Sequence, residues 1–200
     1  MRLILKGSAL LAGLLMSAAL FAADFVEGKD YVKVEGFPEA KTPVVREFFS
    51  YNCPHCYRME HTLSPVVKQL GSDVSFERTP VGAGRPAWQL SQLAYYLAQT
   101  FKVTEQSHGA IFKQVQELAP FATEADVKRF FEGQGIAAAD IDKALASADR
   151  SFTLMGYDNQ TALSGISGVP SLLVNGKYML NIQGRSSEEL AALVKFVAKL

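Results

Sequence analysis

The chain has 200 residues, of which 48% are hydrophobic, and this is enough for one domain with a core or for a small domain with an insertion. Such a hydrophobic content excludes a disordered chain. Lys plus Arg and Asp plus Glu number 20 each, so no basic excess points to nucleic acid and no polybasic run points to a lipid surface.

Residues 1–22 have the layout of a secretory signal peptide. Arg2 and Lys6 give it a positive start, and an uncharged run rich in leucine and small residues follows from Ser8 to Phe21. The run is short for a membrane span and no second span follows, although an uncleaved anchor is the alternative. We therefore expect an exported protein whose mature chain carries 18 basic and 20 acidic side chains.

A buried strand followed directly by a helix is predicted next. Residues 43–50 are rich in bulky valine and phenylalanine, which favour a strand. Pro54 suits the first turn of a helix, where its missing N–H is harmless. Apolar residues then recur at helical spacing from Cys56 to Leu70, and Pro65 within that run is expected to kink the helix.

The remaining pattern divides the chain into an α/β part and a helical part. A second strand is predicted over residues 74–79, and residues 85–150 show helical periodicities with no strand between them, which indicates a helical insertion. Two strands, 171–174 and 177–180, flank Asn175-Gly176, a strong signal for a two-residue hairpin turn. Thr123 with Asp126 and Ser186 with Glu189 resemble capping boxes that open helices. The order is β-α-β, helices, β-β-α, an α/β fold class.

Cys53 and Cys56 are the only cysteines, and a loop this short restrains almost nothing in the unfolded chain. A thiolate is the species that attacks a disulfide, and a helix start stabilises one through free N–H groups and a partial positive charge. His55 adds positive charge at mildly acidic pH. Cys53 is therefore the expected exposed nucleophile, and Cys56, one turn later, the expected resolving thiol.

Other interpretations of the pair are weaker. A zinc site needs about four ligands, and only His55, His61 and His108 are available besides the cysteines, without metal-binding spacing. Two inert core thiols would not be separated by Pro-His. We expect neither a metal nor a cofactor, and we expect His61 and His108 to be ordinary surface or hydrogen-bonded histidines.

Two further positions are candidates for the site. Glu47 interrupts an apolar strand, so it is either a buried acid with a raised pKa that exchanges a proton with Cys56, or a strand-end carboxylate paired with a lysine. Val169-Pro170 precedes a strand, where proline is tolerated at the start. Base rates alone favour a trans Val169–Pro170 bond.

These residues resemble the DsbA family of thiol:disulfide interchange proteins. The stretch from Glu47 to Tyr57 is similar to the active-site strand and helix start of that family, and residues 168–178 are similar to its cis-proline strand and hairpin. The likeness spans essentially the mature chain, with the helical insertion matching mainly in pattern. Asn52 departs from the family, whose members carry an aromatic residue before the first cysteine, and the loop 81–86 also differs.

The resemblance implies a thioredoxin fold interrupted by an all-helical insertion, with residues 23–84 and 151–200 in the thioredoxin-like domain and 85–150 in the insertion. It implies a cis Pro170, a backbone at Val169 that binds substrate in extended form, and Glu47 as the buried acid behind the cysteines. It also implies a periplasmic location and reoxidation by a quinone-linked membrane oxidase of the DsbB type.

We therefore expect a protein disulfide oxidoreductase, a monomer that donates its Cys53–Cys56 disulfide to unfolded or folding exported proteins with free cysteines. The alternatives are a disulfide isomerase or reductase, and a chaperone-like binding module with incidental cysteines. The isomerases of the envelope carry an N-terminal dimerisation domain, and residues 23–42 leave no room for one.

Overall fold

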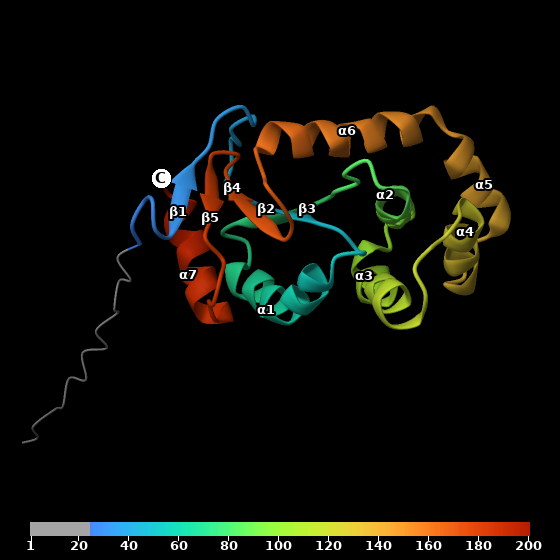
Figure 1. Cartoon of the computed structure of the whole chain (residues 1–200), viewed down its shortest axis with the longest axis horizontal. Helices are drawn as coiled ribbons and strands as arrows, with labels where there is room; N and C mark the ends of the chain where they lie inside the picture. The colour runs from blue at the N-terminus through green and yellow to red at the C-terminus, as the bar shows by residue number, and fades with distance from the viewer. Residues whose placement is uncertain (1–24) are drawn as a thin grey trace, which may run out of the picture.

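The structure, a computed structural model, describes residues 25–200, so the predicted signal peptide lies outside the described residues. Its centre is one mixed five-stranded sheet (Figure 1). In the order of the sheet, the strands are β1 (Tyr31–Lys33), β5 (Tyr178–Leu180), β4 (Ser171–Val174), β2 (Val44–Phe49) and β3 (Ser75–Pro80). Only β2 and β3 run parallel, and the other neighbours are antiparallel.

Helices cover both faces of this sheet and extend beyond the β3 side. Helices α1 and α7 pack together on one face, while α6 crosses the other (Figure 1). The helices are α1 (Pro54–Leu70), α2 (Pro86–Thr100), α3 (Thr104–Lys113) with the π-helix η1 (Gln114–Leu118), α4 (Glu124–Gly133), α5 (Ala138–Ala146), α6 (Ala148–Ser164) and α7 (Ser187–Val197). The predicted fold class, a thioredoxin fold interrupted by helices, is confirmed.

Strand β2 places its side chains on two faces because successive residues of a strand point in opposite directions. Val45 joins the core between the sheet and helices α1 and α7, and Phe49 joins the core of the helical region. Glu47 lies between them in the same alternation, whereas Phe48 belongs to a core cluster with Leu173. The alternation thus directs the Glu47 carboxylate toward the face that carries the cysteine helix.

The structure differs from the predicted elements in three places. Strand β1 was not predicted, because three residues are too few for an alternating pattern and β1 exists by pairing with β5. Three residues separate β4 from β5 instead of two, although Asn175 and Gly176 both have the positive φ expected of the turn. The boundary at residue 150 falls inside α6, which continues without a break to Ser164. Our proposed domain division therefore moves its second boundary to the end of that helix.

Local sequence signals act as expected at several helix ends. Both predicted capping boxes are present, at Thr123 with Asp126 and at Ser186 with Glu189. Helix α1 runs through Pro65 without ending. No helix within residues 25–200 is long and apolar enough to cross a membrane.

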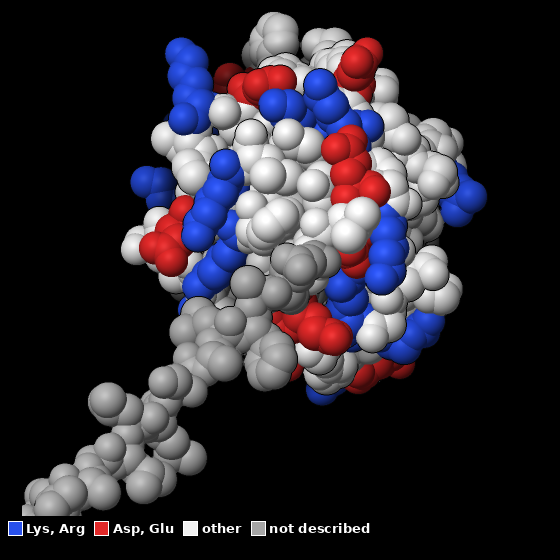
Figure 2. Space-filling model, turned by 90° about the vertical axis from the view of Figure 1, so that its left-hand side faces the viewer, with Lys and Arg blue, Asp and Glu red and all other residues white. Residues whose placement is uncertain are grey.

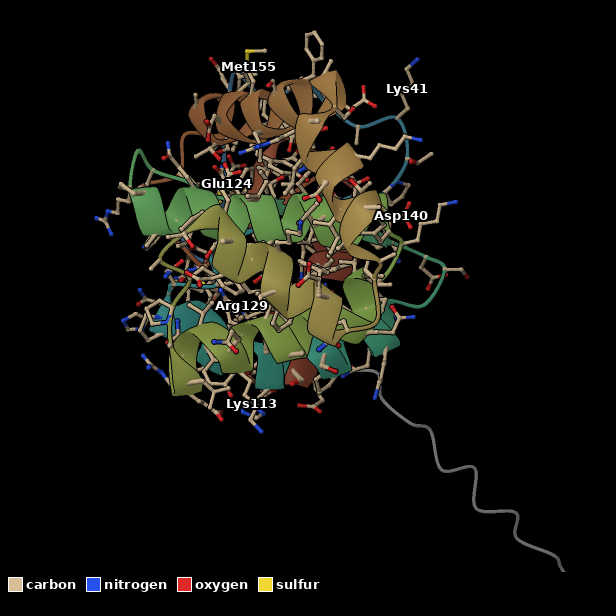
Figure 3. All side chains as sticks on the ribbon, turned by 90° about the vertical axis from the view of Figure 1, so that its right-hand side faces the viewer. Lys41, Lys113, Glu124, Arg129, Asp140 and Met155 are labelled. Atoms are coloured by element: carbon tan, nitrogen blue, oxygen red, sulfur yellow. The ribbon has the colours of Figure 1, made fainter. Side chains whose placement is uncertain are left out.

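The surface carries charges of both signs. On the face shown in Figure 2, basic and acidic side chains are interspersed around an uncharged centre. At the far end of the helical region, the exposed basic side chains of Lys113 and Arg129 and the exposed acidic side chain of Asp140 share one face (Figure 3).

Candidate active site

Cys53 occupies the N-cap of α1, directly after the turn that leaves β2. Its backbone is extended, with φ −95° and ψ 112°, and Pro54 takes the first helical position. The backbone N–H of Cys56 donates to Cys53 Sγ over 3.2 Å, and the N–H of Cys53 itself donates to the Ser50 carbonyl. The N-cap side chain thus satisfies one of the free donors of the helix start, as the sequence predicted.

This environment separates the acidities of the two thiols. A hydrogen bond from the Cys56 thiol, the N–H groups of Cys56 and His55, and the charge of His55 together outweigh burial and lower the pKa of Cys53 to about 6. Burial raises the pKa of Cys56, and the hydrogen bond to Cys53 and the negative charge of Glu47 add to that rise. One thiol therefore ionises readily while its neighbour retains its proton.

The expectation of an exposed Cys53 is wrong, because only 5% of this residue is accessible to solvent. It belongs to the core cluster of the helical region, and its Sγ lies 3.5 Å from the carbonyl oxygen of Val169. The Val169–Pro170 bond is cis, as the family resemblance implied and the base rate did not. The segment that leads into β4 therefore packs against Cys53 and limits the directions from which a substrate can reach its sulfur.

His55 lies on the exposed side of the first helical turn. Its Nδ1 is 2.8 Å from Nη2 of Arg58. Its charge lowers the pKa of Cys53 through space, since Nδ1 contacts Arg58 and not the sulfur.

Glu47 is fully buried and paired, so each of the two earlier interpretations is correct in one respect. The parallel register of β2 and β3 sets Glu47 directly beside Arg78, whose Nε donates to Glu47 Oε2 over 2.9 Å. Burial raises the pKa of Glu47 to about 7, with the attraction of Arg78 opposing that rise and the charge of Glu60 adding to it. The partner is an arginine and not the lysine that we considered.

The sequence analysis missed the polar residues behind the cysteines. Arg78 Nη2 reaches Glu60 Oε2 at 3.5 Å, Glu60 Oε1 lies 3.2 Å from His108 Nε2, and His108 Nδ1 lies 2.9 Å from the Tyr51 hydroxyl. Two signals were available. Glu60 follows Cys56 by one helical turn, and His108 precedes the apolar pair Ile111 and Phe112 at helical spacing.

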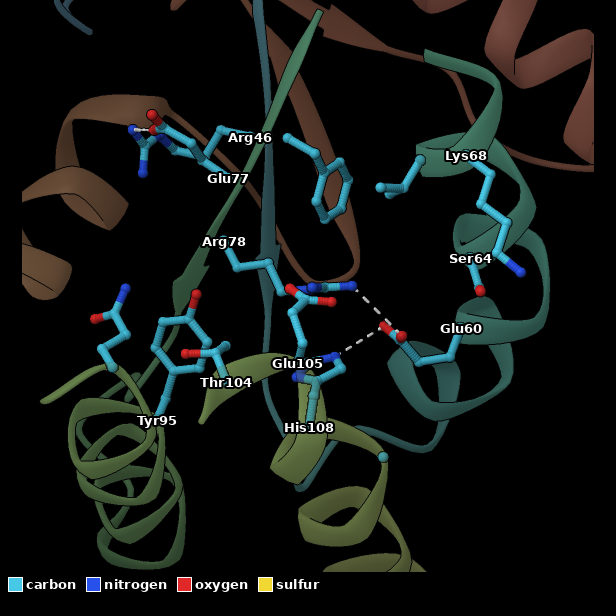
Figure 4. A pocket seen from close by; sticks show the side chains of 14 residues that line it. Arg46, Glu60, Ser64, Lys68, Glu77, Arg78, Tyr95, Thr104, Glu105 and His108 are labelled. Carbon is cyan, nitrogen blue, oxygen red and sulfur yellow. Dashed lines mark hydrogen bonds and ion pairs between the residues drawn. The ribbon is translucent and has the colours of Figure 1, made fainter. Parts of the chain in front are cut away.

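Arg78, Glu60 and His108 border a polar cavity of about 630 Å³ between β3 and helices α1, α2 and α3. Figure 4 shows Arg78, Glu60 and His108 converging on one another there. Within residues 25–200, no group of three or more His, Cys, Asp or Glu side chains has the arrangement of a metal site.

The site combines a reactive cysteine at a helix start with a second thiol, one turn later, that keeps its proton. A strand that begins with a proline lies beside the two cysteines. On a thioredoxin fold, these features define a dithiol–disulfide oxidoreductase. The model of the family described as the DSBA-like thioredoxin domain matches residues 44–193 of the chain. The chain belongs to this family, and it is a thiol:disulfide oxidoreductase.

Named relatives cover nearly the full length. The thiol:disulfide interchange protein DsbA of Pseudomonas syringae pv. tomato is 31% identical over 94% of this chain and 90% of its own. The protein of the same name from Escherichia coli O6:H1 is 32% identical over 92% and 90%. The crystal structure of Pseudomonas aeruginosa DsbA has a TM-score of 0.77 and 26% identity over 88% and 94%. A complex of Proteus mirabilis DsbA with a non-covalently bound peptide, PWATCDS, has a TM-score of 0.75 and 30% identity over 88% and 97%.

Proposed function

We propose that this protein is an oxidase of the periplasm, which donates its Cys53–Cys56 disulfide to exported proteins while they fold. The observation that carries the proposal is the environment of Cys53, whose pKa lies near 6 at the N-cap of α1. A sulfur that is stable as a thiolate leaves readily, and the dithiol form is then favoured over the disulfide. The predicted signal peptide supports the location.

The reaction proceeds by two exchanges at sulfur. A substrate thiolate attacks Cys53 Sγ, the Cys53–Cys56 bond breaks, and its electron pair passes to Cys56 Sγ. Glu47, with a pKa of about 7, gives its proton to the Cys56 thiolate in the buried site. A second substrate thiolate then attacks the substrate sulfur of the mixed disulfide, and Cys53 leaves as a thiolate. The substrate has gained a disulfide and the protein a dithiol.

Substrate binding is assigned to the backbone at Val169, beside Cys53. An extended peptide that pairs with this segment adds a strand and brings its cysteine sulfur to Cys53. The peptide held by the Proteus mirabilis relative supports a peptide-binding role. Reoxidation of the dithiol by a quinone-linked membrane oxidase of the DsbB type completes the proposed cycle.

Equilibration of the Cys53–Cys56 pair with glutathione tests the direction of the reaction. We expect a potential more positive than about −200 mV, because a stabilised thiolate favours the dithiol. Alkylation of free thiols at a series of glutathione ratios, followed by mass analysis, measures it. A potential near the −270 mV or so of thioredoxin would rule out the oxidase and favour the reductase alternative.

Cys56→Ala is expected to raise the pKa of Cys53. The Cys56 thiol is the largest cause of the lowered value, and alanine cannot donate in its place, whereas Cys56→Ser retains a donor. Ultraviolet absorbance of the thiolate, recorded against pH, measures the change. At pH 7 about nine tenths of Cys53 should ionise in the reduced wild-type chain, given its pKa of about 6. Equal midpoints in the alanine and serine variants would contradict the assigned cause.

A further inference from the structure

Arg78 is shared between two carboxylates, Glu47 of β2 and Glu60 of α1. Its Nε donates to Glu47 Oε2 at 2.9 Å, while its Nη2 reaches Glu60 Oε2 at 3.5 Å. Glu47 Oε1 is buried and has no hydrogen-bond partner. An arginine and a carboxylate commonly pair through two parallel bonds, whereas here Nη2 makes its contact with Glu60 and no second bond reaches Glu47 Oε1.

Glu60 meets the helical region at His108, where Glu60 Oε1 and His108 Nε2 are in contact but do not form an aligned hydrogen bond. Its Oε1 lies 3.2 Å from His108 Nε2, and His108 Nδ1 lies 2.9 Å from the hydroxyl of Tyr51, in the turn that carries Cys53 (Figure 4). A neighbouring carboxylate favours a hydrogen on Nε2, so the Tyr51 hydroxyl donates to Nδ1 and fixes the ring. Burial lowers the pKa of His108, which favours the neutral ring at pH 7. The contacts with His108 and Arg78 outweigh burial and hold the pKa of Glu60 below its usual value.

Few groups besides these face His108. Glu60 approaches it from α1 and Arg78 from β3, while Tyr51 lies in the active-site turn and Glu105 precedes it on its own helix. Tyr95 of α2 and the other charged side chains of the cavity lie around them, namely Arg46, Lys68 and Glu77. Of the residues around His108, Glu60 is the one that contacts both His108 and Arg78.

We propose that Glu60 and His108 are positioning residues that hold Arg78 away from a second bond to Glu47, and so keep Glu47 able to carry the proton that Cys56 requires. The inference rests on the proposed role of Glu47 in disulfide transfer. It adds a contribution of the helical insertion to the redox site, because His108 comes from α3 and Glu60 from the cysteine helix.

The position of Arg78 affects the transfer of a proton from Glu47 to Cys56. When a substrate thiolate opens the Cys53–Cys56 bond, the electron pair reaches Cys56 Sγ and the proton comes from the Glu47 carboxyl group. If Glu60 does not hold Nη2, the guanidinium of Arg78 turns both bonds toward Glu47 and stabilises the carboxylate. Glu47 then holds its proton only at lower pH, and Cys56 lacks a donor at neutral pH.

Glu60→Gln tests the proposal with single-turnover oxidation of a reduced dicysteine peptide between pH 5 and pH 8. A second bond from arginine lowers the pKa of a carboxyl group by about one unit or more, so we expect a rate about 10-fold lower at pH 8 and nearly unchanged at pH 5. The peptide thiols also ionise over this pH range and change the rate. Each rate is therefore divided by the rate of a control variant at the same pH, so that this effect cancels. Glu105→Gln is the matched control, because it removes a carboxylate from the same cavity without touching Arg78.

Substitutions of His108 provide a second, independent test of the proposal. His108→Leu releases Glu60 and should show the same pH-dependent loss, whereas His108→Gln keeps a donor toward Glu60 and should restore the wild-type profile. A purely structural role would instead lower the rate by one factor at every pH. Profiles of Glu60→Gln and His108→Leu that match Glu105→Gln would overturn the proposal. If Glu60→Gln does not fold, as judged by circular dichroism, the His108 pair decides by the same criterion.

Infrared titration separates this inference from the proposed function. The carboxyl C=O band of Glu47, assigned by its loss in Glu47→Gln, reports the proton on Glu47 without any substrate. The charge of Glu60 itself raises the pKa of Glu47, so the deciding variant is His108→Leu, which keeps that charge. A lower midpoint in His108→Leu than in Glu105→Gln supports the positioning role even if the wild-type chain fails to oxidise peptides. Equal midpoints refute it even if the wild-type chain is a good oxidase.

Discussion

Cys53→Ser is expected to reduce peptide oxidation by roughly 1,000-fold or more, to the uncatalysed level, because a serine hydroxyl can neither hold a disulfide nor leave as a thiolate. Cys56→Ser should also fail to oxidise, but for a different reason. It keeps the reactive thiol of Cys53, which exchanges with oxidised glutathione, forms a mixed disulfide and releases one glutathione thiol; without Cys56 to displace the bound glutathione, this mixed disulfide should accumulate. Loss of peptide thiols and the mass of the trapped species distinguish the two variants.

Peptide binding provides the control for this pair of variants. The carbonyl of Val169 remains in both, so a non-covalent peptide should bind each as well as it binds the wild type. A chaperone-like module with incidental cysteines would keep its full activity in Cys53→Ser. Undiminished activity in that variant would therefore refute the assigned nucleophile and favour the binding module.

Glu47→Gln is expected to stabilise the fold at alkaline pH while it slows disulfide transfer. The folded-state pKa of Glu47, about 7, lies above the ordinary value of 4.5, so the folded chain binds the extra proton between these values. Stability therefore falls as pH rises from 4.5 through 7, by about 3 kcal/mol in total for this fully buried group. Glutamine has no such penalty, and Arg78 keeps Glu60 as its charged partner.

Urea unfolding at pH 5 and pH 8 measures this effect. The Cys53→Ser background removes the thiolate, whose own titration would otherwise add to the pH dependence. We expect Glu47→Gln to gain up to about 3 kcal/mol relative to its parent at pH 8 and little at pH 5. Glu27→Gln, which alters an exposed carboxylate, is the matched control. A gain of the same size at both pH values would show that packing, and not ionisation, is responsible.

Glu47→Gln is expected to lower the rate of disulfide transfer, although it raises stability at alkaline pH. Restored to a chain with both cysteines, Glu47→Gln should oxidise peptides about 100-fold more slowly at pH 7, because general acid catalysis contributes about that factor or more. The variant then combines higher stability with lower activity, which is a common consequence of replacing a buried catalytic group.

Predictions from local pattern were accurate where neighbouring residues decide the structure. The strand that ends before Cys53, the proline-led start of α1 and both capping boxes follow from residues within one or two turns of each other. The division into two domains stays a prediction, and its boundary at residue 150 falls inside α6 because a helical periodicity does not reveal where the helix ends. Strand β1 was missed because pairing with a distant strand, and not its own three residues, creates it.

The amino-acid sequence by itself determined the fold class, the reactive pair and the position of Cys53 at a helix start, since these depend on residue type and spacing along the chain. Tertiary structure alone decided the surroundings of the pair. It buried Cys53 beside Val169, set Glu47 against Arg78 across a parallel register, and brought Glu60 and His108 together from separate helices. Burial and contacts with residues distant in the sequence set the pKa of Glu47, and neither leaves a regular pattern in the order of residues.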